Sequence, residues 1–350
     1  MDEESSKEEH YASSSLDSHK VKCWGCGLNL LLESFSPIFK CGWCGAITDQ
    51  SRALRKPDSA CFSRWRCLRD RLFVTLLLCF MLFVICAGVW AIYPIIFSIS
   101  MFYGVFHCLL TAILSILTIT YFCMASFFPP GSPPNITWGS YPVVGKDGLD
   151  NYTFCAYCSK PKPPRAHHCR SCRMCVLDMD HHCPFQIGNC VGSANHWYFI
   201  MFLISVIISC TYVFMMTLYA GFHVWPPLVL RKLTISSSGP RIAASILKEI
   251  VAALASSALL LSARGLVLMY LAFASVSVEI GIVALLWQQL HWIYEGNTYI
   301  NQITSHNSAR RQGGCQNLFR FFGCPHSVLR VFLGSGNSGK LQDISSSKLL

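Results

Sequence analysis

The sequence predicts an α-helical polytopic membrane protein with four transmembrane helices. A cysteine-rich insert separates the second helix from the third, and a small cysteine module precedes the first. Three observations predict this fold class. Charged residues make up 13% of the chain, about half the usual share, while apolar residues reach 53%. Four apolar runs reach the roughly 20 residues needed to cross about 30 Å of hydrocarbon. Many of the 20 cysteines fall in Cys-x-x-Cys pairs.

The formal net charge of +10 is carried by dispersed basic residues, many of them beside apolar runs. We interpret them as anchors to the lipid bilayer and expect no nucleic-acid partner, because no base-reading motif is present. Residues 1–20 are acidic and serine-rich, and we expect a disordered tail without a cleavable signal peptide. Because the cysteine pairs lie next to histidines, metal binding in a reducing compartment is favoured over a disulfide framework.

Residues 21–47 form the predicted N-terminal module. Cys23 and Cys26 are separated by fourteen residues from Cys41 and Cys44, and a glycine follows each pair. Four thiolates at this spacing suit one tetrahedral zinc ion. So short a segment also needs a metal, because it cannot bury enough apolar area to fold alone. The module resembles a small zinc ribbon, which can serve as a docking module or as a structural cap.

The apolar runs define the helical part of the chain. We expect transmembrane helices over 72–96, 102–128, 197–222 and 265–290. A further helical pattern over 241–262 carries Lys248 and Glu249 at its centre, which makes insertion costly. We therefore expect an interfacial helix there, within a loop over 223–264. Glu279 lies inside the fourth run and must face the bundle interior or a water-filled cavity.

Four spans place both termini and the insert on one side of the membrane. Basic residues before the first run favour the cytosol for that side, including the tail over 291–350. We expect an integral multi-pass protein of the endomembrane system or plasma membrane. The loop after the third run is also basic, which weakens this orientation, and a fifth span would move the C-terminus. Glycosylation at the sequons of Asn135 or Asn151 would place the insert in the lumen.

The insert over 129–196 holds more metal-type ligands than two zinc ions require. Two tetrahedral zinc ions need eight ligands. The candidates are Cys155, Cys158, His168, Cys169, Cys172, Cys175, His181, His182, Cys183 and Cys190. A purely structural double zinc finger accounts for most of the cysteines, but it does not explain the proximity of Asp180, His181 and Cys183. A histidine that is oriented by a carboxylate can take the proton of a thiol, so these three residues have the parts of an activated nucleophile.

The spacing C-x2-C-x9-HC-x2-C-x2-C-x4-DHHC over 155–183 resembles the signature of the DHHC palmitoyltransferase family, and it continues as in that family over 189–199. The resemblance implies that Asp180 orients His181, that His181 is the general base and that Cys183 is the acylated nucleophile. It also implies two zinc sites. Their ligands would be Cys155, Cys158, His168 and Cys175 in one site, and Cys169, Cys172, His182 and Cys190 in the other.

The resemblance implies a protein S-acyltransferase. Cys183 would take a fatty acyl group from acyl-CoA, such as palmitoyl-CoA, and pass it to cysteines of membrane-associated substrate proteins, while the helices supply an apolar tunnel for the chain. The alternative is a catalytically weak zinc-scaffold membrane protein that docks partners. A metal or solute transporter is a third class, and it predicts paired ionisable residues in the spans, where the sequence has chiefly Glu279.

The chain departs from the family pattern in three places. Between the nucleophile and the last ligand of the second zinc site it has six residues instead of five. Gln186 is the extra residue, and Phe185 replaces a tryptophan. Displacing a nucleophile by about 1 Å affects catalysis, so this insertion bears on activity. Two elements thought to brace the insert against the helices, at 129–131 and 298–301, lack the family's acidic residue.

Overall fold

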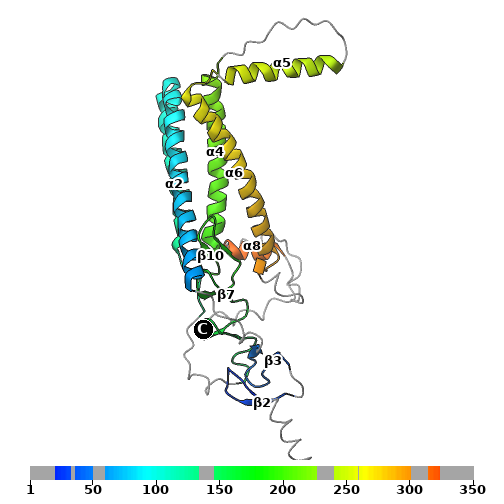
Figure 1. The fold of residues 1–350 in the computed structure, drawn as a ribbon. Helices are drawn as coiled ribbons and strands as arrows, with labels where there is room; N and C mark the ends of the chain where they lie inside the picture. Colours follow the sequence, from blue (N-terminus) through cyan, green and yellow to red (C-terminus); the bar gives the residue numbers. More distant parts are fainter. Residues whose placement is uncertain are drawn as a thin grey trace, which may run out of the picture. The chain divides into compact units, whose positions relative to one another are not determined.

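The structure is a computed structural model that describes residues 20–32, 36–49, 60–133, 146–226, 240–258, 260–300 and 314–323 (Figure 1). The chain divides into two compact units, Met1–Ala284 and Leu285–Leu350. The expectations for the disordered tail, for the sequon at Asn135 and for most of the C-terminal tail lie outside the described residues.

Among the described residues, five long helices begin in the first unit. They are α2 (Ala60–Ile99), α3 (Met101–Phe127), α4 (His196–Val224), α5 (Pro240–Ala258) and α6 (Ala263–Tyr294), the last of which continues into the second unit. Within the described part of the chain, α2, α3, α4 and α6 are long and apolar enough to cross a membrane. The chain thus has four candidate membrane helices. The position of α5 at the membrane surface stays a prediction.

Helix α2 begins at Ala60, whereas the apolar run begins at Leu72. Its 40 residues span about 60 Å at 1.5 Å per residue, roughly twice the thickness of the hydrocarbon core. The N-terminal turns carry arginines, and they pack on the insert through Ser63 and Asp70. Because these turns are polar, the apolar run marks only the part of α2 that suits the membrane.

The helices pack through small and branched side chains. In Figure 1, α2 and α4 run side by side, and α3 packs against both of them. One buried cluster joins three helices through Ala91, Ile92, Ile95 and Ile96 of α2, Met216 and Ala220 of α4, and Leu268 of α6. Between α3 and α4, the rings of Phe122 and Phe202 lie 5.5 Å apart. Nearby, Thr118 and Ser209 share a hydrogen bond of 3.0 Å.

The strands described are all three residues long and form four small sheets. Three sheets are antiparallel pairs: β1 (Lys20–Lys22) with β2 (Asn29–Leu31), β7 (His167–Cys169) with β8 (Met174–Val176), and β9 (His181–Cys183) with β10 (Asn189–Val191). The fourth sheet has the order β3 (Ile38–Lys40), β4 (Ile47–Asp49), β5 (Thr153–Cys155) and β6 (Lys160–Lys162). Strands this short bury little apolar area, so their stability must come from another source.

The N-terminal module and the start of the insert share one sheet. Strand β4 pairs in parallel with β5, and Ile47 lies opposite Thr153. Leu149 is 3% exposed and packs into the core of the module, beside Cys23 and Cys44. The two segments, which we expected as separate domains, therefore fold together even though residues 50–152, which include α2 and α3, separate them in the sequence.

The second unit contains α8 (Cys315–Phe321) beside the end of α6. The side-chain amide of Asn317 donates to the carbonyl oxygen of Tyr294 at 2.9 Å, and the N–H of Gly314 donates to the same oxygen at 3.1 Å. These bonds satisfy a carbonyl group that the end of a helix leaves without an intrahelical partner. Asn317 and Gly314 thus fix α8 to the last turn of α6.

Candidate active site and metal centres

The structure brings the predicted metal ligands together in three clusters. In each cluster four ligand atoms lie within 4.8 Å of one another. The clusters are Cys23, Cys26, Cys41 and Cys44 in the N-terminal module, and Cys155, Cys158, His168 and Cys175, and Cys169, Cys172, His182 and Cys190, in the insert. The first is the grouping that the spacing predicts, the other two are those that the family resemblance implies, and each could hold one metal ion.

The spacing of the sulfur atoms fits zinc. A tetrahedral ion with Zn–S bonds of about 2.3 Å holds its sulfur ligands about 3.8 Å apart. The distance between the two sulfur atoms is 3.7 Å for Cys23 and Cys44 and 3.7 Å for Cys158 and Cys175. In the second insert cluster, His182 Nδ1 lies 3.5 Å from the sulfur of Cys172. Donor type, number and spacing therefore all suit tetrahedral zinc.

In the second insert cluster, the ionisation of one thiol changes the pKa of its neighbours. Hydrogen bonds from Cys172 and Cys190 lower the pKa of Cys169 far below that of an ordinary thiol. The same kind of contact with Cys169 and Cys172 raises the pKa of Cys190. Negative charge on one sulfur thus makes its neighbours harder to ionise. A bound cation would relieve this repulsion and let all the sulfurs ionise.

The turns that hold the ligands use left-handed backbone. Gly27 and Gly45, which follow the two cysteine pairs of the N-terminal module, have φ of 77° and 76°. A Cβ on Gly45 would lie 2.7 Å from Asp150 Cα. In the insert the same position is taken by Ser159 and Arg173, with φ of 51° and 56°. This conformation costs a non-glycine residue roughly 1–2 kcal/mol, which metal binding would offset.

Asp180, His181 and Cys183 form a hydrogen-bonded relay. His181 Nδ1 lies 2.8 Å from Asp180 Oδ2, and Asp180 is fully buried. His181 also hydrogen-bonds Cys183. The buried ring of Phe199, at the start of α4, packs edge-on against the His181 ring at 5.6 Å. The imidazole is therefore held by a carboxylate on one side and by an aromatic ring on another.

The relay favours a charged imidazole beside an ionised thiol. Burial lowers the pKa of His181, but its hydrogen bonds to Asp180 and Cys183 outweigh burial and raise that pKa to about 9. Burial raises the pKa of Cys183. The hydrogen bond and charge of His181, together with the backbone N–H groups of Gln186 and Ile187, more than reverse this and lower the pKa below the ordinary value. A thiolate is the reactive form of cysteine, so this arrangement activates Cys183.

The extra residue after Cys183 lies in the loop of the hairpin and does not change the register of its two strands. Strands β9 and β10 keep their pairing, with Asn189 opposite Cys183 and Cys190 opposite His182. The loop between them packs on α2, where the rings of Phe185 and Phe73 lie 5.0 Å apart. The insertion therefore lengthens the loop and leaves the strand that carries Cys183 in register.

Gly188 allows the same loop to approach α2 closely. It has φ of 58°, and a Cβ at this position would lie 2.6 Å from Val74 and 2.9 Å from the carbonyl oxygen of Asp70. Gln186 in this loop has its Oε1 3.7 Å from Cys183 Sγ, a distance at which the thiol donates a weak hydrogen bond. The loop thus lies between α2 and the nucleophile.

Asp70 of α2 reaches the second insert cluster, a contact that the sequence analysis missed. Its Oδ2 lies 3.0 Å from Nε2 of His182, whose Nδ1 belongs to the ligand set. Its Oδ1 accepts hydrogen bonds from Arg69 Nε and Nη2 at 2.9 and 2.7 Å. A carboxylate in this position fixes the orientation and tautomer of a metal-binding histidine. The only signal in the sequence was one acid among the arginines before the apolar run.

Backbone carbonyls brace the insert where the family's acidic residue is missing. Leu177 N donates to the carbonyl oxygen of Gly131 at 3.0 Å, and Ala194 N donates to that of Pro130 at 3.2 Å. Buried Asn195 donates to the carbonyl oxygens of Ala125 and Cys190 at 3.2 and 2.8 Å. The end of α3 is therefore tied to the insert without a carboxylate.

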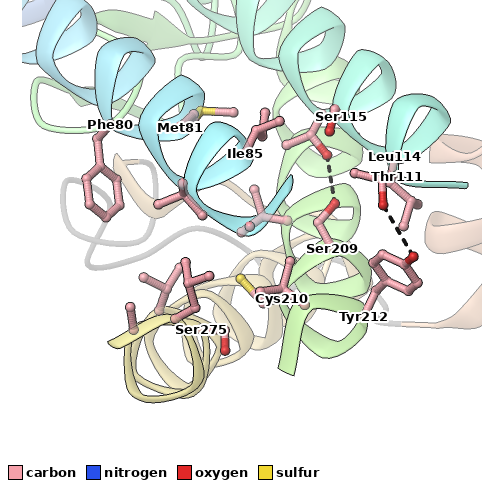
Figure 2. A pocket seen from close by; sticks show the side chains of 18 of the residues that line it. Phe80, Met81, Ile85, Thr111, Leu114, Ser115, Ser209, Cys210, Tyr212 and Ser275 are labelled. Atoms are coloured by element: carbon pink, nitrogen blue, oxygen red, sulfur yellow. Dashed lines mark hydrogen bonds between the residues drawn. The ribbon is translucent and has the colours of Figure 1, made fainter. Parts of the chain in front are cut away.

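A cavity of about 520 Å³ lies among α2, α3, α4 and α6, and Gln186 also lines it. Apolar side chains of the four helices make up most of its wall, and several of them converge on the space in Figure 2. Along α2 the lining residues extend from Leu77 to Tyr93, about 24 Å at 1.5 Å per residue. The cavity is thus long and mostly apolar, and Gln186 links it to the nucleophile.

Hydrogen-bonded side chains line the end of the cavity farthest from Gln186. Tyr93 of α2 bonds Thr111 of α3 through its hydroxyl and donates to the carbonyl oxygen of His107 at 2.8 Å. Tyr212 of α4 lies 3.3 Å from Thr111 Oγ1, drawn as a dashed line in Figure 2, and 3.2 Å from His107 Nδ1. These bonds tie three helices together and form a polar floor.

Other predicted residues have simpler roles. Arg165, which precedes the two histidines at 167–168 and whose charge would suit a CoA phosphate, forms an ion pair of 2.9 Å with Asp178. Glu279 of α6 is half-buried and accepts a hydrogen bond of 2.7 Å from the exposed Thr211 of α4, so its carboxylate contacts a neighbouring helix. The exposed side-chain amide of Asn151 accepts from Lys40 at 3.2 Å, at the boundary between the N-terminal module and the insert.

The fold combines four helices that are long and apolar enough to cross a membrane with a Cys/His-rich insert, in which the thiol of Cys183 contacts a residue of an apolar cavity. Residues 149–306 match the family model described as DHHC palmitoyltransferase. The chain is similar to palmitoyltransferase ZDHHC16A of Danio rerio, with 35% identity over 97 residues covering 28% of this chain and 22% of the relative. It is also similar to palmitoyltransferase ZDHHC15 of Xenopus laevis (44% over 72 residues, 21% of each chain) and to palmitoyltransferase pfa3 of Emericella nidulans (38% over 108 residues, 27% and 21%).

The chain therefore carries a DHHC palmitoyltransferase domain and is related to proteins of that family. The matched segments span about a fifth of the length of these curated relatives. The match to this family model and to relatives named palmitoyltransferase agrees with the resemblance found in the sequence, so that prediction is confirmed.

Proposed function

We propose that the protein is a protein S-acyltransferase in which Cys183 takes a palmitoyl or similar fatty acyl group from acyl-CoA and transfers it to cysteines of membrane-associated proteins. The single observation that carries this proposal is the relay of Asp180, His181 and Cys183 beside the cavity that Gln186 lines. An activated thiol next to a long apolar cavity suits a substrate with a reactive carbonyl group and an alkyl chain.

The reaction would proceed in two steps. The Cys183 thiolate attacks the thioester carbon of acyl-CoA, a carbon–sulfur bond forms, and the CoA sulfur leaves with a proton from the His181 imidazolium. His181 then accepts a proton from the thiol of the substrate protein, which attacks the acyl-Cys183 thioester and releases the free enzyme. Asp180 holds the imidazole in the orientation that both steps require.

The cavity would bind the acyl chain. Burying each methylene contributes about 0.8 kcal/mol, so a palmitoyl chain would contribute on the order of 10 kcal/mol to binding. The length of the cavity along α2 agrees with an extended fatty chain lying between the helices. Tyr93, Thr111 and Tyr212 would limit the length of the chain, because their hydrogen bonds form the polar floor.

We propose three resident zinc ions, two in the insert and one in the N-terminal module. Bound zinc would supply structural cross-links, each contributing on the order of 10 kcal/mol to folding. The ligands themselves order the loop that carries the nucleophile, because His182 and Cys190 flank it in the paired strands β9 and β10.

We further propose that the insert and both termini face the cytosol and that α5 lies at the opposite membrane surface. Arginines in the first turns of α2 and the free thiols of the insert support a reducing cytosolic side. On α5, Leu247, Val251 and Leu254 leave an apolar face exposed, as an interfacial helix requires.

The decisive experiment is autoacylation. Purified protein incubated with labelled palmitoyl-CoA should acquire label that hydroxylamine removes, and Cys183→Ser should abolish it. Cys123→Ser, which alters a cysteine of α3, is the matched control and should label normally. Undiminished labelling of Cys183→Ser would place the chemistry at another residue.

The alternative function is a zinc scaffold that docks partners without efficient catalysis. The observation that favours it is the group of large apolar side chains on the N-terminal module, where Leu31 and Ile38 are 56% exposed and Trp43 is 50% exposed. A scaffold predicts no hydroxylamine-sensitive label on the wild-type protein, so the autoacylation assay separates the two functions.

A further inference from the structure

Gln186 both contacts the nucleophile and lines the cavity. Its Oε1 lies 3.7 Å from Cys183 Sγ, and every other described residue in the cavity wall belongs to one of the four helices. We propose that the carboxamide of Gln186 is a catalytic residue that donates a hydrogen bond to the carbonyl oxygen of the acyl group during attack by Cys183. This inference rests on the proposed acyl transfer and adds a residue to it.

The position of the acyl group follows from where its alkyl chain binds and from where its carbonyl carbon must react. With its alkyl chain in the cavity, the acyl group must bring its carbonyl carbon within bonding reach of Cys183 Sγ. The carbonyl group then lies between the cavity and the thiol, next to Gln186, which lines the cavity and contacts the thiol. The other polar side chains in the wall are hydroxyls and the thiol of Cys210, all on the helices, so Gln186 is the nearest amide donor.

The carboxamide can present either a donor or an acceptor at this point. A half-turn about its last side-chain bond exchanges the oxygen and the nitrogen with little change of shape. With a free thiol, the oxygen accepts the S–H hydrogen bond. With an acyl group in place, the amide nitrogen faces the carbonyl oxygen. The backbone N–H groups of Gln186 and Ile187 already hydrogen-bond Cys183 Sγ. The side-chain amide of Gln186 is therefore the group that can donate to the carbonyl oxygen of the acyl group.

The proposed contact strengthens as the reaction proceeds. An electron pair of Sγ forms the new carbon–sulfur bond, and the carbonyl π pair moves onto the oxygen, which becomes negative. The amide N–H of Gln186 stabilises that negative charge. The electron pair on the oxygen then re-forms the carbonyl π bond, and the bond between the carbonyl carbon and the CoA sulfur breaks. The CoA sulfur takes the proton of His181. Removing one such donor typically lowers the rate by about 100- to 1,000-fold.

The loop does not depend on the Gln186 side chain for its shape. Phe185 packs on Phe73, Gly188 packs on Val74, and Asn189 remains paired with Cys183. Gln186→Met keeps the length of the side chain and removes the donor, so it isolates the hydrogen bond from the packing of the loop. Gln186→Glu places an acceptor of similar shape at the same point.

The test compares two reactions of the same thiol in the full-length protein. Transfer from palmitoyl-CoA passes through a negative oxygen, whereas alkylation by iodoacetamide displaces iodide from a saturated carbon and needs no such donor. Single-turnover acylation of Gln186→Met should be about 100- to 1,000-fold slower than that of the wild type, while the alkylation rate of Cys183 stays within about twofold. Gln186→Glu should be at least as slow in acylation.

The controls separate this inference from the proposed function. Gln316→Met, the same change on exposed α8, should leave both rates unchanged, and zinc content reports whether each variant is folded. Unchanged acylation of Gln186→Met, or an equal loss of acylation and alkylation, overturns the role of Gln186. Normal alkylation of Cys183 without any acylation of the wild type overturns the proposed function, and the inference with it.

Discussion

At the scale of residues, two adjacent histidines are fixed by two carboxylates through different ring nitrogens. Asp180 binds Nδ1 of His181, which leaves the other nitrogen for chemistry with Cys183. Asp70 binds Nε2 of His182, which leaves Nδ1 for the metal cluster. The neighbouring residues therefore take different roles because the partner of each imidazole determines which nitrogen is available.

The role of Asp70 predicts the behaviour of the second zinc site. Asp70→Ala removes the carboxylate that orients His182, so the affinity for zinc should fall by about 10- to 100-fold. Transfer of zinc to a coloured chelator should accelerate for one of the three ions. Asp178→Ala, which removes the exposed partner of Arg165, is the matched control. Equal rates of release in the two variants would contradict the role of Asp70.

The relay predicts a pH dependence for the reactivity of Cys183. Because its pKa is lowered and that of His181 is about 9, the thiolate–imidazolium pair persists from below the usual thiol pKa up to about pH 9. Alkylation by iodoacetamide should therefore remain fast towards acid pH. In His181→Ala the stabilising charge is lost and the pH–rate curve should move to higher pH. A curve that does not move would mean that His181 does not activate the thiol.

At the scale of elements, the apolar runs predicted the four candidate membrane helices because each run is long enough to cross the hydrocarbon core. They did not predict that α2 begins at Ala60, because its first turns are stabilised by contacts with a distant part of the chain. The N-terminal ligand cluster follows from its Cys-x-x-Cys spacing, whereas the two interleaved clusters of the insert were grouped in advance only through the family resemblance. The contact of Asp70 with His182 is set by tertiary packing, and spacing along the chain carries no sign of it.

The floor of the cavity predicts the preferred length of the acyl chain. Tyr212→Ala removes one of the hydrogen-bonded rings that form the floor, so the cavity should become deeper. Two further methylenes would then contribute about 1.6 kcal/mol, which corresponds to a roughly tenfold rise in the preference for stearoyl-CoA over palmitoyl-CoA. Competition between the two substrates measures this ratio.

The control for that experiment lies on the same helix. Tyr219 of α4 is outside the cavity wall and packs on His223, and Tyr219→Ala should leave the ratio unchanged. A similar shift in both variants would indicate that loosening α4, rather than opening the floor, changes the selectivity.

At the scale of the molecule, the three metal clusters and the helices form one connected path of contacts within the first unit. The N-terminal module joins the insert through β4 and β5, and the insert joins the membrane helices through Asp70 and Asn195. The sequence separates these parts widely, and they were predicted as separate domains. The fold joins them, so the stability of the N-terminal module bears on the segment that leads into the first insert cluster.

This connection predicts that the loss of the N-terminal metal weakens the insert. Cys41→Ser should remove one zinc ion and loosen the core in which Leu149 is buried. It should also weaken the ion pair of 2.7 Å between Lys40 and Asp150 and the ring contact between Trp24 and Phe154. The segment over 146–155 should then become sensitive to protease, because its partners across the boundary are lost.

Cys61→Ser, at an exposed thiol of α2, should change neither zinc content nor cleavage. If Cys41→Ser loses its zinc while this segment resists protease as well as the wild type does, the module and the insert are stabilised independently, because the shared sheet then transmits no stability between them.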